Sequence, residues 1–155
     1  MANLPRWARV SVLAADTRGT PASSSVPGVL ASVRRACRGV VLDLPRTADE
    51  GTVRCCDLLV VVSGTDAGSA AGLAALLARL GSSGVETVLA VRRDQGVAIA
   101  GAEELAQWCG LPLAGRLPSS PRLRGDLARG LGPGERRRSG LVRAVRHLAE
   151  EVGLA

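Results

Sequence analysis

The chain has 155 residues, enough for one domain, and 46% of them are apolar, so a packed core is expected. Its formal charge is +6, and all twenty of its basic residues are arginine, because the sequence contains no lysine. These 155 residues therefore supply no P-loop lysine, no Schiff-base lysine and no lysine general base.

The cysteines and the single histidine do not have the spacing of a metal site. Cys37, Cys55, Cys56 and Cys109 form no C-x-x-C pair, and His147 lies far from most of them in the sequence. We expect no metal site and reduced, buried thiols. The N-terminus lacks the apolar segment of an export signal, and no apolar run is long enough to span a bilayer. We therefore expect a cytoplasmic protein.

Short apolar runs alternate along the chain with segments of helical periodicity. The patterns predict strands over 9–14, 39–44, 57–62, 87–91 and 111–118, and helices over 26–37, 67–80, 101–108, 121–129 and 139–152. Strands separated by helices favour an α/β fold with a mainly parallel sheet of about five strands and flanking helices. We expect residues 1–131 to form this core and residues 132–155 to form a basic linker and a terminal helix that packs on it.

The apolar run over 39–44 contains one carboxylate, Asp43, two residues before Pro45. A continuous run rich in valine and leucine is typical of a strand buried on both faces of a parallel sheet. Asp43 would then lie at the carboxyl end of the strand, where open α/β sheets bind ligands, and Pro45 would end the pairing. In a nucleotide hydrolase, a carboxylate at this place helps to hold Mg²⁺. The alternative is that Asp43 only caps a turn after a core strand.

No segment has the phosphate-binding pattern G-x-x-x-x-G-K-[ST]. The nearest approach is the turn over 64–72, where Gly64 and Gly68 stand between a predicted strand and a predicted helix. Glycines there could leave backbone amides free for an anion at the helix N-terminus. The alternative is a tight turn with small residues that let the helix pack closely on the sheet.

The charged and polar residues bear on two further classes of site, a hydrolytic triad and a basic binding surface. A hydrolytic triad is not indicated, because His147 is the only histidine and no G-x-S-x-G elbow is present. Arg136, Arg137 and Arg138 make a basic region that could contact an anion, a nucleic acid or a protein partner. No aromatic stacking platform accompanies them, so a solvated basic face is the alternative.

Several stretches, taken in order, resemble the later part of the MinD/ParA superfamily of P-loop ATPases. Val40–Pro45 is similar to the Walker B strand with its D-x-P ending, and Cys56–Val62 is similar to the following "CD-hhhVV" strand. Leu111–Pro118 is similar to the "LG-P-hhG-hhP" segment, and Asp126–Ser139 is similar to the closing "G-x-P…S" stretch. The CpaE-like branch, the septum-site-determining proteins of actinobacteria and their tight-adherence pilus and secretion neighbourhood, is the closest match. The resemblance runs from about Leu4 to Leu148.

The resemblance implies a P-loop NTPase fold in which Asp43 occupies the Walker B position, and intact relatives use ATP and Mg²⁺. The family's P-loop strand should precede these motifs, and Arg92-Arg93 stands near where many relatives carry an adenine-reading asparagine. Without a P-loop lysine, a P-loop hydroxyl and phosphate-wrapping amides, Asp43 cannot assemble the Mg²⁺–phosphate clamp. We expect a degenerate or truncated member that binds no cofactor and is not an enzyme.

The expected function is therefore non-catalytic. A CpaE/septum-site-determining-like protein would regulate or position cell-division or tight-adherence pilus and secretion machinery through protein contacts. It could act as a homodimer, and partners could hold it peripherally at the membrane. Two alternatives stay open: a residual nucleotide-binding ATPase that uses the turn over 64–72, and a basic nucleic-acid-associated regulator.

Overall fold

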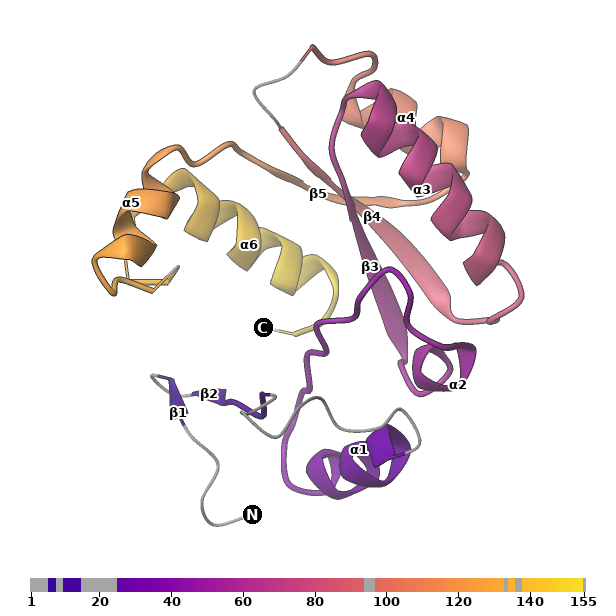
Figure 1. Ribbon diagram of the computed structural model, residues 1–155, viewed down its shortest axis with the longest axis vertical. Helices are drawn as coiled ribbons and strands as arrows, with labels where there is room; N and C mark the ends of the chain where they lie inside the picture. The colour runs from indigo at the N-terminus through magenta and orange to yellow at the C-terminus, as the bar shows by residue number, and fades with distance from the viewer. Residues whose placement is uncertain are drawn as a thin grey trace. The chain divides into compact units, whose positions relative to one another are not determined.

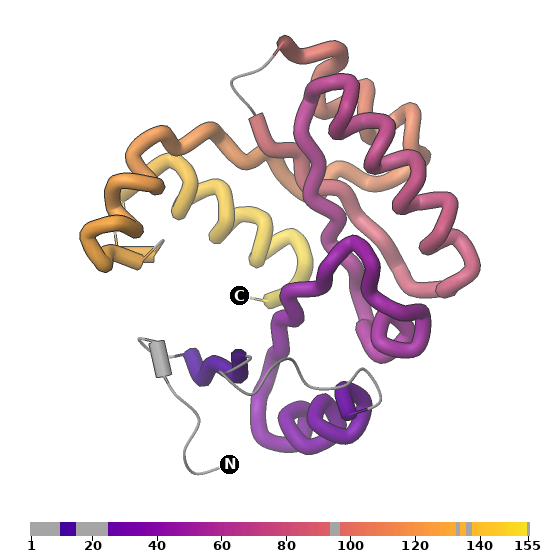
Figure 2. Tube along the Cα trace, viewed as in Figure 1, coloured from indigo at the N-terminus to yellow at the C-terminus, as the bar shows by residue number. Residues whose placement is uncertain are grey.

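The computed structural model describes residues 6–7, 10–14, 25–93, 97–132, 134–135 and 138–154 (Figure 1). The chain divides into two compact units, Met1–Cys56 and Asp57–Ala155. Figure 2 traces the backbone through both. No helix among the described ranges is long and apolar enough to cross a membrane.

The second unit is built around a parallel sheet. Its strands are β3 (Leu58–Ser63), β4 (Glu86–Arg92) and β5 (Leu113–Leu117), in the spatial order β3-β4-β5. Both pairs are parallel, with Ser63 opposite Val91 and Arg92 opposite Leu117, so the carboxyl ends of the three strands lie level. The predicted α/β class and parallel pairing are confirmed, with three strands in the described part of the sheet in place of about five.

Four helices belong to this unit: α3 (Ala67–Leu80), α4 (Ala102–Cys109), α5 (Arg122–Ala128) and α6 (Gly140–Glu151). Figure 1 shows α3 and α4 on one side of the sheet and α6 on the other. Each of α3 and α6 begins at a residue whose side-chain oxygen accepts a hydrogen bond from the first turn, Asp66 and Ser139 respectively. Helix α4 ends at Gly110, whose φ of 64° lies in the left-handed region that favours glycine.

The core lies between the sheet and the α3–α4 pair. It combines residues of β3 and β4, residues of both helices and one residue of the loop before α4: Val61, Leu73, Leu89, Val91, Ala100, Leu105 and Ala106. Leu89 of β4 and Leu105 of α4 are the largest fully buried side chains. Because every member is aliphatic, the stability of this core comes from aliphatic packing without aromatic contacts.

The first unit contains α1 (Val26–Arg34), α2 (Glu50–Val53) and a two-residue ladder between β1 (Arg6–Trp7) and β2 (Val10–Ser11). The strand predicted over 9–14 is reduced to β2, which pairs antiparallel with β1 and not with the parallel sheet. Asp49 starts α2, because its Oδ1 accepts a hydrogen bond from Thr52 N at 2.9 Å.

The strand predicted over 39–44 does not form, and this corrects the expectation on which the position of Asp43 depended. Val41 is 79% exposed and Asp43 is exposed. A continuous apolar run indicates a tendency toward burial, but a strand also needs a neighbour that accepts and donates its backbone hydrogen bonds. None of the described segments pairs with residues 39–44, so this stretch has no ladder to join.

Candidate functional site

The carboxyl edge of the sheet gathers the turns that follow β3, β4 and β5, the edge at which open α/β sheets bind ligands. Backbone hydrogen bonds hold these turns together: Ile99 N donates to Thr65 O at 2.8 Å, and Arg93 N donates to Leu117 O at 2.9 Å. The loop before α4 is thereby tied to the turn after β3, and the end of β4 to the end of β5. This edge is the candidate site.

The turn between β3 and α3 is closed by its own side chains. Asp66 Oδ1 accepts a hydrogen bond from Ser69 N at 3.0 Å, and Asp66 Oδ2 accepts one from Ser69 Oγ at 2.6 Å. Ser63, which is buried, donates from Oγ to the carbonyl oxygen of Gly64 at 3.1 Å. These bonds to Ser69 hold the pKa of the Asp66 carboxyl below its ordinary value, so this group is an anion at neutral pH.

The helix start at this turn is occupied by its own capping side chain. The Ser69 amide that would approach a phosphate already donates to Asp66, and the carboxylate repels a second anion at the same helix start. Gly68 lies close to the cap, because a Cβ at this residue would stand 3.2 Å from Asp66 Oδ1. Its lack of a side chain leaves room for the capping carboxylate.

A cavity of about 680 Å³ opens where β5 ends. Its walls come from the segment after β5, from α5 and from the start of α6: Pro118, Ser119, Ser120, Pro121, Arg122, Leu123, Asp126, Gly132, Arg138, Ser139, Gly140 and Leu141. Prolines and leucines supply the apolar surface, and serine hydroxyls and arginines supply donors. The cavity could hold a compact group with an apolar body and a polar or anionic end.

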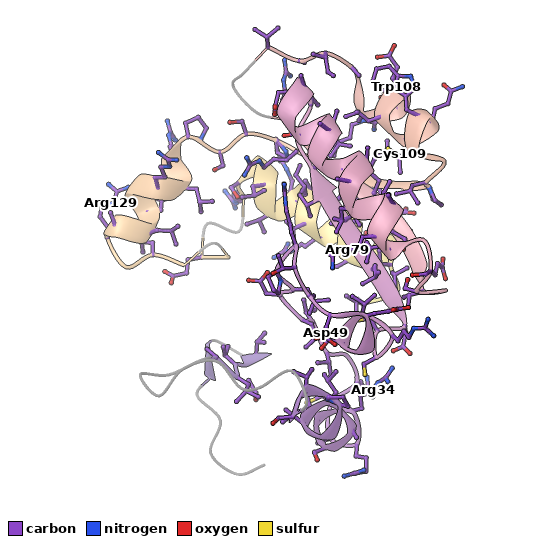
Figure 3. All side chains as sticks on the ribbon, turned by 45° about the vertical axis from the view of Figure 1, so that its right-hand side comes forward. Arg34, Asp49, Arg79, Trp108, Cys109 and Arg129 are labelled. Atoms are coloured by element: carbon purple, nitrogen blue, oxygen red, sulfur yellow. The ribbon has the colours of Figure 1, made fainter. Side chains whose placement is uncertain are left out.

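One carboxylate in the cavity wall is neutralised from outside it. Asp126 is buried, and its Oδ1 accepts from Arg129 Nη2 at 2.7 Å. Figure 3 shows Arg129, the residue that follows α5. The backbone oxygen of Asp126 also accepts from Leu131 N at 2.9 Å, which closes the turn after α5. Asp126 therefore holds α5 and the following turn together. Because Arg129 neutralises its carboxylate, Arg122 and Arg138 give the cavity wall a net positive charge.

The residues singled out from the sequence are distributed over both units. Asp43 belongs to the first unit, whereas Gly64 and Gly68 belong to the second. Arg138 lines the cavity, and Arg136 and Arg137 lie outside the described residues. The structure thus does not gather Asp43, the turn and the arginines within one unit.

Sequence reasoning did not find the cavity itself. The signals that could have shown it were the prolines at both ends of Ser119-Ser120 and the cap residue Ser139, whose Oγ accepts from Val142 N at 3.1 Å. The cysteines are free and half-buried, where burial was expected. Among the described residues, no three His, Cys, Asp or Glu side chains come together as a metal site. The side chain of His147 is largely exposed, and its Nδ1 lies 3.8 Å from Glu151 Oε1.

Comparisons with known proteins give likenesses in structure only. No protein-family model matches the sequence, and no curated protein matches it. One similar solved structure is the MinD cell division protein of Aquifex aeolicus, with a TM-score of 0.74 and 14% sequence identity over 85% of this chain. Another is the cell division ATPase MinD of Pyrococcus furiosus, with a TM-score of 0.66 and 16% sequence identity over 85% of this chain. A third is the MinC:MinD cell division protein complex of Aquifex aeolicus, with a TM-score of 0.73 and 15% sequence identity over 94% of this chain.

The chain spans 61%, 58% and 69% of the length of these three chains, so the likeness concerns part of the MinD fold. At such low identity it establishes the arrangement of strands and helices and leaves activity open. The parallel sheet, the crossover helices and these neighbours together show that the chain has the α/β fold of part of MinD.

Proposed function

We propose that this chain is a non-catalytic, MinD-like cell-division protein that regulates or positions a division machine through protein contacts. Its likeness to MinD chains, one of them from a complex with MinC, supports a division role and a protein partner of the MinC kind. The CpaE-like assignment, with tight-adherence pilus or secretion machinery as the target, rests on the sequence motifs alone.

The observation that carries the non-catalytic part is the closed turn after β3. Asp66 occupies the start of α3 with a negative charge, and the 155 residues contain no lysine to offset a triphosphate. The negative charge at this helix start and the absence of a lysine amine both disfavour the binding of a triphosphate there. The turn after β3 therefore offers no lysine amine, and its helix start already carries a negative charge.

Calorimetric titration with a non-hydrolysable ATP analogue, with and without Mg²⁺, tests this. We expect no saturable heat and no phosphate release in a steady-state assay. Asp66→Asn keeps a capping oxygen but removes the charge, so it separates repulsion from loss of the cap. Turnover of ATP by the purified chain would contradict the proposal.

The cavity after β5 favours a second candidate, nucleotide binding without hydrolysis. Its apolar walls and serine hydroxyls suit a planar base, and Arg122 and Arg138 suit an anion. The same titration separates the candidates. No saturable binding would favour the first, and binding weakened by Arg138→Ala alone would favour the cavity. Binding weakened by Asp43→Ala would instead favour a residual ATPase site.

The division role is tested in cells. A fluorescently tagged chain should concentrate at the division site, and its overproduction should lengthen cells or displace septa. A tagged Arg138→Glu variant tests the basic region, because it reverses one exposed charge near the start of α6. Uniform distribution with normal septa would contradict a division role. DNA binding that weakens steeply with salt would instead support the nucleic-acid alternative.

A further inference from the structure

The cavity after β5 is lined by the second unit alone, and contacts among its own segments hold its walls. Every described residue that lines it lies between Pro118 and Leu141. Leu123 N donates a hydrogen bond to Ser120 O at 3.0 Å, which ties α5 to the segment after β5. A Cβ at residue 140 would stand 3.8 Å from Pro118 Cγ, so the start of α6 lies against the same segment. The cavity is therefore preformed, as small-molecule sites usually are.

The charges in the wall favour an anion. Arg122 and Arg138 line the cavity, and the carboxylate among the lining residues, Asp126, is buried. Asp126 is paired with Arg129, which is not a lining residue, so its negative charge does not offset the two arginines of the wall. Guanidinium groups bind carboxylates and phosphates strongly, because their forked N–H groups match pairs of anionic oxygens.

A hydroxyl group and aliphatic side chains add to this wall. Ser139 Oγ accepts a hydrogen bond from Val142 N at 3.1 Å, which uses a lone pair and leaves the hydroxyl proton for another acceptor. Leu123 and Leu141 supply aliphatic surface. None of the described lining residues is aromatic, so no ring is present on which a nucleobase could stack. A branched aliphatic group needs no ring, because it fills such a surface by dispersion contacts alone.

We propose that this cavity binds a small oxyanion with a branched aliphatic body. Its carboxylate or phosphate end meets Arg122 and Arg138, and its body lies against Leu123 and Leu141. A volume of about 680 Å³ lies in the range of small-molecule sites and is larger than a bare inorganic ion requires. A carboxylate and a phosphate monoester share the anionic oxygens that the arginines recognise, so the experiment includes one of each. This inference goes beyond the proposed function and does not depend on it.

Heteronuclear NMR of the backbone amides of the full chain, followed through titrations, tests the proposal. The two oxyanion probes are isocaproate and isopentyl phosphate, added up to about 30 mM because ligands of so few atoms bind with modest affinity. Acetate lacks the aliphatic body, and isohexylamine keeps it but reverses the charge. Arg122→Gln and Arg138→Gln each remove one guanidinium group from the wall. Arg124→Gln is the matched control, because Arg124 lies on α5 but is not a lining residue.

One oxyanion or both should give saturable shifts at the amides of Ser120, Leu123 and Gly140, and the tighter of the two identifies the end group. Acetate and isohexylamine should give none. Each substitution in the wall should weaken binding about threefold or more, because it removes a charge-assisted hydrogen bond, whereas Arg124→Gln should leave the affinity unchanged.

Three results would overturn the proposal: no saturable shift with either oxyanion, equally tight binding of isohexylamine, or equal weakening by Arg124→Gln. Displacement of isocaproate by a lower concentration of a non-hydrolysable ATP analogue would overturn it in favour of nucleotide binding in the same cavity. Location in cells and turnover of ATP, which test the proposed function, do not affect these shifts, so the two proposals can fail independently.

Discussion

Leu148 of α6 packs directly on Gly115 of β5. A Cβ at residue 115 would stand 3.5 Å from both Cβ and Cδ1 of Leu148, the distance of ordinary van der Waals contact. The glycine therefore lets the terminal helix approach the edge strand closely, and α6 covers β5 at this point. The same helix supplies Leu141 to the cavity wall, and its cap residue Ser139 also lines the cavity.

Substitutions at Gly115 should show a size threshold. Gly115→Ala places a methyl group in normal contact with Leu148, so the free energy of unfolding should change by less than about 1 kcal/mol. Gly115→Leu forces α6 outward and should lower it by about 1 to 3 kcal/mol. Urea unfolding measures both. Adding Leu148→Ala to Gly115→Leu should recover part of the loss, and equal effects of alanine and leucine would contradict the contact.

Leu105 and Trp108 test the position of the core from a single helix. Leu105 of α4 is 1% exposed, whereas Trp108 on the same helix is 63% exposed. Figure 3 shows Trp108 on α4. Leu105→Ala should lower the free energy of unfolding by about 2 to 5 kcal/mol, because it leaves a cavity between α4 and the sheet. Trp108→Ala should change it by less than about 1 kcal/mol. A larger effect at Trp108 than at Leu105 would show that α4 faces the sheet differently.

The sequence pattern was most informative where local signals and packing agree. The helix predicted over 67–80 has the bounds of α3, because Asp66 caps its start and Gly81 stands at its end. The strands predicted over 57–62 and 87–91 match β3 and β4 within one residue at each end, since buried parallel strands are continuous apolar runs. Parallel pairing followed from the helices between them.

The stretch over 39–44 shows what such a pattern lacks. Four of its six residues are aliphatic, yet β3 has β4 beside it and 39–44 has no strand among the described residues. Sequence composition reports a tendency toward burial and cannot supply the neighbour that completes a ladder. The cavity was missed for a related reason. Its wall combines three segments, after β5, in α5 and at the start of α6, and only the fold brings them together.

Asp66 should make stability depend on pH in one direction. The bonds from Ser69 lower the pKa of its carboxyl in the folded chain, so its stabilising effect is complete above the unfolded value near 3.8 and is lost as pH falls through the lower folded value. At neutral pH, the Asp66→Asn variant should therefore have a lower midpoint temperature of thermal unfolding than the unaltered chain. The difference should vanish in strong acid, where both side chains are uncharged. Thermal unfolding at a series of pH values measures it, and a difference that grows in acid would contradict the assigned cap.

Cys109 should react slowly while the chain is folded. Burial raises the pKa of its thiol, because the end of α4 packs against the aliphatic core and the thiolate is disfavoured there. At about pH 8, alkylation of Cys109 should be slower in the folded chain than in the same chain unfolded in urea, because less thiolate is present and access is restricted. Mass spectrometry of peptides after timed alkylation follows each cysteine separately. Because the urea-unfolded chain is its own reference, equal rates in the two states would show that α4 does not shield this thiol, and would contradict the packing of its last turn.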